Sequence, residues 1–277
     1  MEANVLVDSE ALSQVVYAVA SSHRYSQINR QFIMRVAQNE LVKGSSFKET
    51  VKATKNKLHQ VAGAFLQNDL HYSGWLELLK KANQSGDKDE FMQACRSIMR
   101  FHTSTRERLP FLSGFYEHIF SSLPPIQSIL DIACGFNPLT IPWMGLPMGI
   151  HYLAIDIFQD LIDFLSAYFA LLPIEGQAKA FDVIESIPTH PVDLALILKT
   201  IPCLEQVDKL AGVRILDNLQ AKYILISYPA RSLGGRSKGM QNNYQEQFHI
   251  LIDGRGYQVK KYDFPTEFVY LLSTESI

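Results

Sequence analysis

A short turn of small residues follows an apolar run near the middle of the chain, where a ligand could approach the backbone closely. The run Ile129–Ala133 predicts a buried strand, and Cys134 and Gly135 continue it into a turn that ends at Pro138. A dinucleotide-binding loop would need three spaced glycines to hold a pyrophosphate, whereas Gly135 stands almost alone. The turn therefore favours a cofactor that carries no phosphate groups.

Acidic residues at or near the ends of three predicted strands could bind the polar groups of such a cofactor. Asp131 lies in the first strand, Asp156 ends the second strand roughly 20 residues further on, and Asp182 ends the third. Asp156 is placed to accept hydrogen bonds from ribose hydroxyls, and Asp182 from an adenine amino group. Aspartates at strand ends often only cap helices, but three of them beside a small-residue turn favour S-adenosylmethionine as the cofactor.

Composition and charge limit the class of protein. The chain has 277 residues, enough for one large and one smaller domain, and its net charge of -2 means that only local patches could attract phosphate. The three cysteines match no metal-ligand spacing, and an odd, sparse count suits a reducing compartment. The longest apolar run, Leu161–Ile174, contains Asp163 and is too short to cross a bilayer. We therefore expect a cytoplasmic protein without a metal site or a membrane anchor.

The elements that must position these residues fall into two parts. Residues 1–100 have apolar positions at helical spacing and no strand alternation, which predicts a small helical domain. A basic stretch within it makes this domain a candidate for RNA binding. Residues 101–277 alternate short apolar runs with helical stretches, which is typical of a parallel sheet covered by helices. The expected parallel strands are Ile129–Ala133, Tyr152–Ile157, Ala178–Val183, Leu194–Leu198 and Tyr223–Ser227.

Two more strands are expected at the end of the chain. Tyr257–Phe264 and Glu267–Leu272 are separated only by Pro265 and Thr266, and so short a link forces the two strands to be antiparallel. The complete α/β sheet would have seven strands, mostly parallel, with a C-terminal antiparallel pair. This is the Rossmann-like fold of class I methyltransferases.

Helices are expected between the strands and before the first of them. Ser104 and Glu107 have the spacing of a capping box, so a helix should begin there and continue through Leu109–Phe120. Leu161–Leu171 and Glu205–Leu219 are the helical stretches expected between strands.

Two basic segments could contact nucleic acid. In the N-terminal part, Lys52, Lys55 and Lys57 lie in a stretch with a single acid, and as RNA contacts they would raise affinity without reading sequence. A solvated helix face explains them nearly as well. The second segment, 231–240, follows the fifth strand and offers three cations for phosphate and one apolar prop for a base, which are Arg231, Arg236, Lys238 and Met240. Lys199, after the fourth strand, could contact the substrate or the cofactor, or could cap a helix.

Five segments spread along the chain match one known group of proteins. They read FHTSTRERL at 101–109, LDIACGFNPL at 130–139, DLALILK at 193–199, SYPARSLGGRSKGM at 227–240 and TEFVYL at 266–271. With these segments the sequence resembles the aminoglycoside-resistance methyltransferases of the Arm/Rmt type, which methylate a guanine N7 in the decoding region of 16S ribosomal RNA. The N-terminal part matches this group only loosely, through 57–59 and 63–65.

The resemblance implies roles for individual residues. Arg108 should hold the carboxylate of the cofactor, because its guanidinium offers a bidentate fork; a surface ion pair with Glu107 or Glu117 is the alternative. The other residues expected around S-adenosylmethionine are His102, Thr103, Ser104, Ala133, Gly135, Asp156, Ile157, Asp182, Val183 and Leu198.

The resemblance also implies a substrate, which is 16S rRNA in the assembled 30S ribosomal subunit, and a product that gives aminoglycoside resistance. Guanine N7 presents a lone pair and no proton, so we expect no catalytic base and catalysis by positioning and electrostatics. The base must be turned out of its helix to be reached. We expect a monomer. The alternatives are a methyltransferase of the same fold that acts on another RNA base or a small molecule, and a non-catalytic RNA-binding protein.

Overall fold

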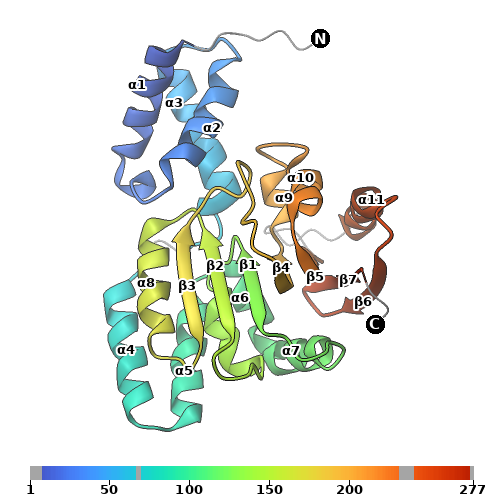
Figure 1. Ribbon diagram of the computed structural model, residues 1–277. Helices are drawn as coiled ribbons and strands as arrows, with labels where there is room; N and C mark the ends of the chain where they lie inside the picture. Colours follow the sequence, from blue (N-terminus) through green and yellow to red (C-terminus); the bar gives the residue numbers. More distant parts are fainter. Residues whose placement is uncertain (1–7, 67–69, 231–239, 275–277) are drawn as a thin grey trace.

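A seven-stranded sheet forms the centre of the protein, and helices cover both of its faces (Figure 1). The computed structural model describes residues 8–66, 70–230 and 240–274. The strand order is β3-β2-β1-β4-β5-β7-β6. The strands are β1 (Ser128–Ile132), β2 (His151–Asp156), β3 (Glu175–Ala180), β4 (Val192–Leu198), β5 (Ala221–Pro229), β6 (Gln258–Asp263) and β7 (Glu267–Ser273). β1 to β5 are parallel, and β7 runs antiparallel to both β5 and β6, so the predicted fold is confirmed.

The helices are distributed before and between the strands. Those that precede the sheet are α1 (Ser9–Ala20), η1 (His23–Tyr25), α2 (Arg30–Leu41), α3 (Phe47–Leu58), the π-helical turn η2 (His59–Gly63), α4 (Tyr72–Gln84), α5 (Lys88–Met99), α6 (Thr103–Arg108), η3 (Leu109–Phe111) and α7 (Leu112–Phe120). Those between the strands are η4 (Asn137–Trp143), α8 (Gln159–Phe169), α9 (Ile201–Leu204), α10 (Ala211–Asn218) and α11 (Met240–Ile252). No helix among the described ranges is long and apolar enough to cross a membrane.

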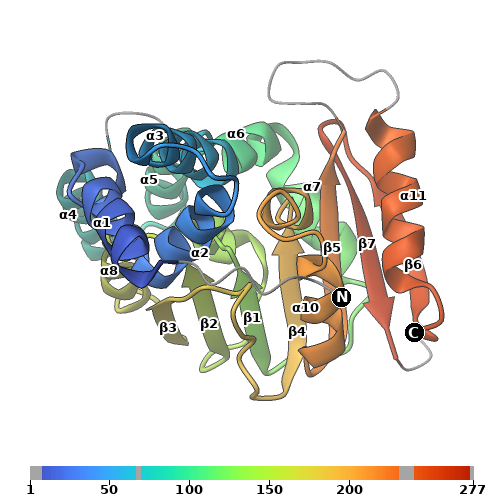
Figure 2. The ribbon, with the colours of Figure 1, turned by 90° about the horizontal axis from the view of Figure 1, so that it is seen from above.

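Successive residues of the central strands point to opposite faces of the sheet, and each face has its own core. Ile129 and Leu196 pack in one core with α4, α5, α7 and α8. Leu130 and Ile197 pack in the other core with α1 to α3 and with α9 to α11. Figure 1 shows α1 to α3 beyond the carboxyl ends of β1 to β3, and Figure 2 shows the same helices from above.

The helices before residue 100 are divided between these two cores. α4 and α5 pack against α8 and η4, whereas α1 to α3 pack mainly against one another. The predicted boundary at residue 100 stays a prediction. Figure 1 shows α1 to α3 beyond the strand ends, and α4 and α5 beside α8 at the edge of the sheet.

The third strand lies three residues earlier than Ala178–Val183, the range expected from the sequence. β3 is an edge strand, and its residues alternate between exposed and half-buried positions instead of forming an apolar run. Asp182 therefore follows the strand end by two residues, and it does not end the strand. The predicted helix Glu205–Leu219 is also shorter in the structure: α9 ends at Leu204, before this stretch, and within it α10 covers Ala211–Asn218.

The predicted capping box at Ser104 and Glu107 is wrong. The helix α6 begins one residue earlier, at Thr103, with His102 at the capping position. The Ser104 hydroxyl pairs with the His102 ring, and the Glu107 carboxylate binds Lys199. The helix gives way to the turn η3 at Pro110, since proline has no N–H to donate, and α7 starts afterwards.

Candidate cofactor site

A cavity of about 860 Å³, its open mouth included, lies at the carboxyl ends of β1, β2 and β4. Most of the residues predicted to surround the cofactor line it. They are His102, Ser104, Ala133, Gly135, Asp156, Ile157, Asp182, Val183 and Leu198. Thr103 and Arg108 are not among the lining residues.

The loop after β1 approaches the cavity with a strained backbone. Ala133 and Gly135 both have φ of 50°, a conformation that costs an alanine free energy but a glycine almost none. A Cβ atom at Gly135 would lie 2.7 Å from Nε2 of His102, so the position has no room for a side chain. This close approach explains why a glycine is needed at the position where the sequence has its lone loop glycine.

Asp156 holds the loop and faces the cavity. Its Oδ2 accepts a hydrogen bond from the Gly135 amide at 2.9 Å, and its Oδ1 accepts from its neighbour Ile157 at 2.7 Å. Burial raises the pKa of the Asp156 carboxyl, while the donated backbone hydrogen bonds act in the opposite direction. Each carboxylate oxygen still has a lone pair to offer a ribose hydroxyl.

Asp182 lies on the same side of the cavity, and a distant residue holds its carboxylate. Oδ1 accepts from the Ile184 amide at 2.9 Å, and Oδ2 accepts from Nε of Arg35 at 3.0 Å. Arg35 belongs to α2, in the N-terminal helices. The sequence did not predict this contact, because the two residues are 147 positions apart.

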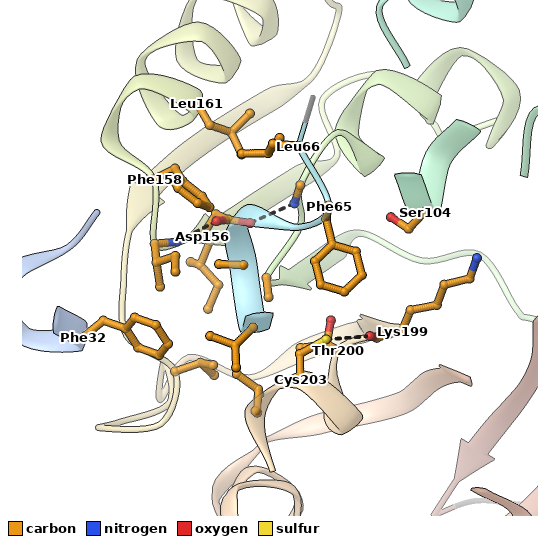
Figure 3. A pocket seen from close by; sticks show the side chains of 18 of the residues that line it. Phe32, Phe65, Leu66, Ser104, Asp156, Phe158, Leu161, Lys199, Thr200 and Cys203 are labelled. Atoms are coloured by element: carbon orange, nitrogen blue, oxygen red, sulfur yellow. Dashed lines mark hydrogen bonds between the residues drawn. The ribbon is translucent and has the colours of Figure 1, made fainter. Parts of the chain in front are cut away.

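The N-terminal helices supply one wall of the cavity. Phe32 from α2 and Val61, Ala62, Phe65 and Leu66 from η2 and the segment after it line the site. Figure 3 shows the rings of Phe32 and Phe65 on the same cavity as Asp156. The sequence analysis missed these residues because apolar side chains at helical spacing look the same whether they pack in a core or line a ligand site.

Two short backbone contacts dock these helices onto the cofactor loops. Ile28 forms a bridge with Phe158, and the Asn29 amide donates to the Ile157 carbonyl at 2.7 Å. Leu66 forms a second bridge with His102. The Asn29 side chain also caps α2. The start of the helix that carries Phe32 and Arg35 is therefore bonded to Ile157, the residue after Asp156.

His102 is a neutral wall of the cavity. Burial lowers the pKa of its imidazole to about 3, and the nearby charges of Lys199, Arg108 and Arg106 add to this shift. Its Nδ1 pairs with the Ser104 hydroxyl at 2.9 Å. A neutral ring with its other nitrogen at the cavity can donate or accept a single hydrogen bond.

Arg108 is buried beneath the loop and not on the surface. Its Nε and Nη2 donate to the two carboxylate oxygens of Glu267 at 2.7 and 2.9 Å, and both side chains are sealed from water. Neither Glu107 nor Glu117, the alternative partners considered from the sequence, forms this pair. The third nitrogen, Nη1, donates to Asn137 at 2.9 Å. Its predicted contact with the cofactor carboxylate stays a prediction.

Asn137 connects the buried arginine to the end of β1. Its amide donates to Asp131 at 2.9 Å, and its carbonyl oxygen also accepts from Tyr116 at 2.7 Å. Asp131 accepts a second hydrogen bond, at 2.7 Å, from Tyr152. Burial raises the pKa of Asp131 to about 7, although these hydrogen bonds and Arg108 act against the rise. Asp131 thus supports the loop from below and does not line the cavity.

Lys199 lies inside the site. It follows β4 with φ of 59°, and its buried ammonium pairs with Glu107 at 2.8 Å. Its backbone N–H donates to Ser227 on β5. A contact between Lys199 and RNA stays a prediction.

The other predicted RNA contacts lie elsewhere. Lys52 is exposed on α3, while Lys55 and Lys57 are half-buried and Lys55 donates to Ser22. Arg231, Arg236 and Lys238 lie outside the described part of the chain. Met240 begins α11, and the structure gives no position for its side chain.

The cavity suits a nucleoside without phosphates. Its lining combines two carboxylates, Asp156 and Asp182, with apolar and aromatic side chains, and Lys199 is the one cation among the described residues that line it. A phosphate would meet these acids without a compensating positive cluster. Ribose hydroxyls and an adenine amino group, in contrast, are donors that the two acids can accept.

Comparisons with known proteins agree with this site. A family model described as "Ribosomal RNA methyltransferase (FmrO)" matches residues 21–271. Two relatives bear the name 16S rRNA (guanine(1405)-N(7))-methyltransferase. The one from Micromonospora echinospora is 36% identical over 95% of this chain and 97% of its own length, and the one from Frankia casuarinae is 36% identical over 95% and 94%. The solved structure of the 16S rRNA methyltransferase RmtF with S-adenosyl-L-homocysteine superposes with a TM-score of 0.84 at 27% identity, over 96% of this chain and 99% of RmtF.

Proposed function

Because the chain belongs to the ribosomal RNA methyltransferase (FmrO) family, as its resemblance to the Arm/Rmt enzymes predicted, we propose that it methylates N7 of a guanine in 16S rRNA. S-adenosylmethionine, when bound, supplies the methyl group. The observation that carries the proposal is the cavity at the strand ends, which joins Gly135, Asp156 and Asp182 in a chain that matches its relatives over 95% of its length.

Different side chains of the cavity bind different groups of the cofactor in this proposal. Asp156 accepts from the ribose hydroxyls, and Asp182 accepts from the adenine amino group. Leu198 supports the sulfonium end, where His102 and Ser104 also lie. Arg108 binds the cofactor carboxylate in this proposal, through the N–H groups that Glu267 and Asn137 leave free.

The proposed reaction requires no general base from the protein. Guanine N7 has a lone pair in the purine plane and carries no proton, so no base is required to generate the nucleophile. The enzyme excludes water and aligns the base with the methyl group. The target base must leave its helix to reach a cavity that is walled by both the sheet and the N-terminal helices.

The substrate is the assembled 30S subunit in this proposal, and the enzyme acts as a cytoplasmic monomer. Residues 1–100 serve as the RNA-binding domain, with Lys52, Lys55 and Lys57 on α3, and the segment 231–240 clamps the RNA near the target base through Arg231, Arg236, Lys238 and Met240. Methylation of this guanine gives aminoglycoside resistance.

A reconstituted assay tests the proposal. Purified protein is incubated with methyl-labelled S-adenosylmethionine and with either 30S subunits or free 16S rRNA, and the modified nucleotide is mapped by mass spectrometry of rRNA fragments. We expect 7-methylguanosine at one site in 30S subunits, and loss of the product with Asp156→Ala. Methylation of a different base or atom, or no methylation with cofactor bound, contradicts the proposal. Labelling of free rRNA alone contradicts the assembled subunit as substrate.

A further inference from the structure

The helix α2 presents two residues to the cofactor site from the same face. Phe32 lines the cavity, and Arg35, three residues later, reaches Asp182. The Arg35 side chain is 28% exposed, whereas the Asp182 side chain is 1% exposed. The cation therefore comes from the N-terminal helices, and the carboxylate that it meets belongs to the loop after β3.

The two donors to Asp182 fix the direction of its carboxylate. Ile184 donates its amide N–H to Oδ1 from the loop itself, and Arg35 donates its Nε–H to Oδ2 from α2. A carboxylate with one donor at each oxygen cannot rotate freely, and each oxygen keeps a lone pair for a further donor. The free lone pairs then have a fixed direction, and Asp182 is one of the residues that line the cavity.

We infer that Arg35 is a positioning residue, which orients Asp182 to accept from the amino group of adenine and so sets the base specificity of the cofactor site. The inference rests on the proposed role of Asp182. The N–H of Arg35 keeps the Asp182 carboxylate aligned, and an aligned acceptor favours a purine with a 6-amino group. A purine without this group leaves the acceptor without a partner, so its binding is weaker.

A second acid near Arg35 does not share this geometry. Glu185 lies 3.9 Å from Nη2 of Arg35 and is exposed, so it is too distant for a hydrogen bond and is screened by water. Arg35 therefore acts on Asp182 and only weakly on Glu185. Glu185→Gln is a matched variant that removes a second carboxylate near Arg35.

The experiment compares two ligands in calorimetry. The first is S-adenosylhomocysteine, and the second is its 6-deamino analogue, in which purine replaces adenine. The wild-type protein should bind the first about tenfold more tightly or better, the difference expected for one hydrogen bond to a charged acceptor. Arg35→Ala should lose most of this ratio by weakening S-adenosylhomocysteine alone. Arg35→Lys, which keeps the charge but not the planar donor, should recover part of it.

Control variants separate positioning from damage to the fold. Glu185→Gln and Arg30→Ala, an exposed arginine that begins the same helix, should leave both affinities unchanged. In a double-mutant cycle, Arg35→Ala should have almost no further effect on the ratio in an Asp182→Ala background.

The outcomes separate the inference from its premise. If the wild type binds both ligands equally, the role of Asp182 is wrong, and the inference fails with it. If the wild type prefers S-adenosylhomocysteine and Arg35→Ala keeps the full preference, the role of Asp182 stands and the inference is overturned. An equal loss of affinity for both ligands in Arg35→Ala also overturns it, since that result indicates a structural role only.

Discussion

The Arg108–Glu267 pair and the Arg35–Asp182 pair each join segments far apart in the sequence, but only the first is sealed from water. Arg108 is 1% and Glu267 0% exposed, and two parallel hydrogen bonds connect them. Arg35 is 28% exposed and makes a single hydrogen bond to its partner. The two pairs have the same chemistry in different dielectric surroundings.

The difference lies in what each pair can influence. Charges buried without water destabilise the fold strongly when one partner is removed, because the other is left unpaired. A part-exposed pair contributes little to stability, but it can still fix the direction of one carboxylate. We therefore expect the buried pair, Arg108–Glu267, to determine whether the cofactor loop folds. We expect the part-exposed pair, Arg35–Asp182, to determine which base of the cofactor the site prefers.

Removal of Glu267 should give the largest effect. Glu267→Ala leaves Arg108 buried without its carboxylate and should lower the free energy of unfolding by about 3–5 kcal/mol, measured by urea denaturation. The double variant Arg108→Met, Glu267→Leu removes both charges and should lose less. A loss below about 1 kcal/mol in Glu267→Ala would remove the distinction between the two pairs.

Removal of Asn137 should give the next largest effect. Its side chain bonds Arg108, Tyr116 and Asp131, so Asn137→Ala removes one hydrogen bond from each of three buried polar groups and should cost about 1–3 kcal/mol. Asn39→Ala is the matched control, because that amide makes one hydrogen bond to Val207 at the surface. Equal losses in the two variants would show that the buried network is no more sensitive than the surface.

The pH dependence of stability should depend on the buried network. The pKa of Asp131 is about 7 in the folded protein and 3.8 for a free side chain, so the folded state holds a proton that the unfolded state releases. Stability should therefore fall as the pH rises from about 4 to about 7, by at most about 1.4 kcal/mol per pH unit from this group. Asp131→Asn should abolish this part of the pH dependence of stability. If the variant lost stability between pH 4 and pH 7 as steeply as the wild type, the assignment to Asp131 would be wrong.

Glu267 should act in the opposite direction at lower pH. Burial alone would raise its pKa, but Arg108, Lys199 and the hydrogen bonds hold the pKa below its usual value of 4.5. A lowered carboxyl pKa contributes stability that is present above the unfolded pKa and is lost as the pH falls through the folded pKa. The two groups can therefore be told apart by their pH windows in the same titration.

Removal of Arg35 should have the smallest effect on stability. Arg35→Ala should cost less than about 1 kcal/mol, since Asp182 keeps its Ile184 donor and water screens the pair. Thermal unfolding of the cofactor-free protein measures this, and Arg30→Ala is the control on the same helix. A cost similar to that of Glu267→Ala would mean that both pairs are structural.

Local patterns in the sequence predicted the parts of the site that lie on single strands and turns. The run Ile129–Ala133, the lone glycine at Gly135 and the acid at Asp156 each carry their signal within a few residues, and the structure places Gly135 and Asp156 in direct contact. The antiparallel pair at the C-terminus followed from the short link between its strands. The range predicted for the edge strand β3 was three residues too late, because the alternating exposure of this strand gives no apolar run in the sequence.

Contacts between distant residues could not be predicted in the same way. Arg108 and Glu267 are 159 positions apart, and nothing near either residue indicates the other. The resemblance had singled out the segments around both, but only the fold shows that they meet. The same holds for Phe32 and Phe65, whose apolar spacing is that of any amphipathic helix.

The bridges Ile28–Phe158 and Leu66–His102 also bear on the order in which the protein is made. During synthesis α1 to α3 emerge first, and they can pack against one another before β2 exists. These helices form one wall of the cavity. The other walls form only after Phe158 and the lining residues up to Leu204 have been synthesised and have folded into the sheet and its loops. A ligand that binds only the closed cavity therefore cannot assist the early steps, and it stabilises the chain only after its long-range contacts have formed.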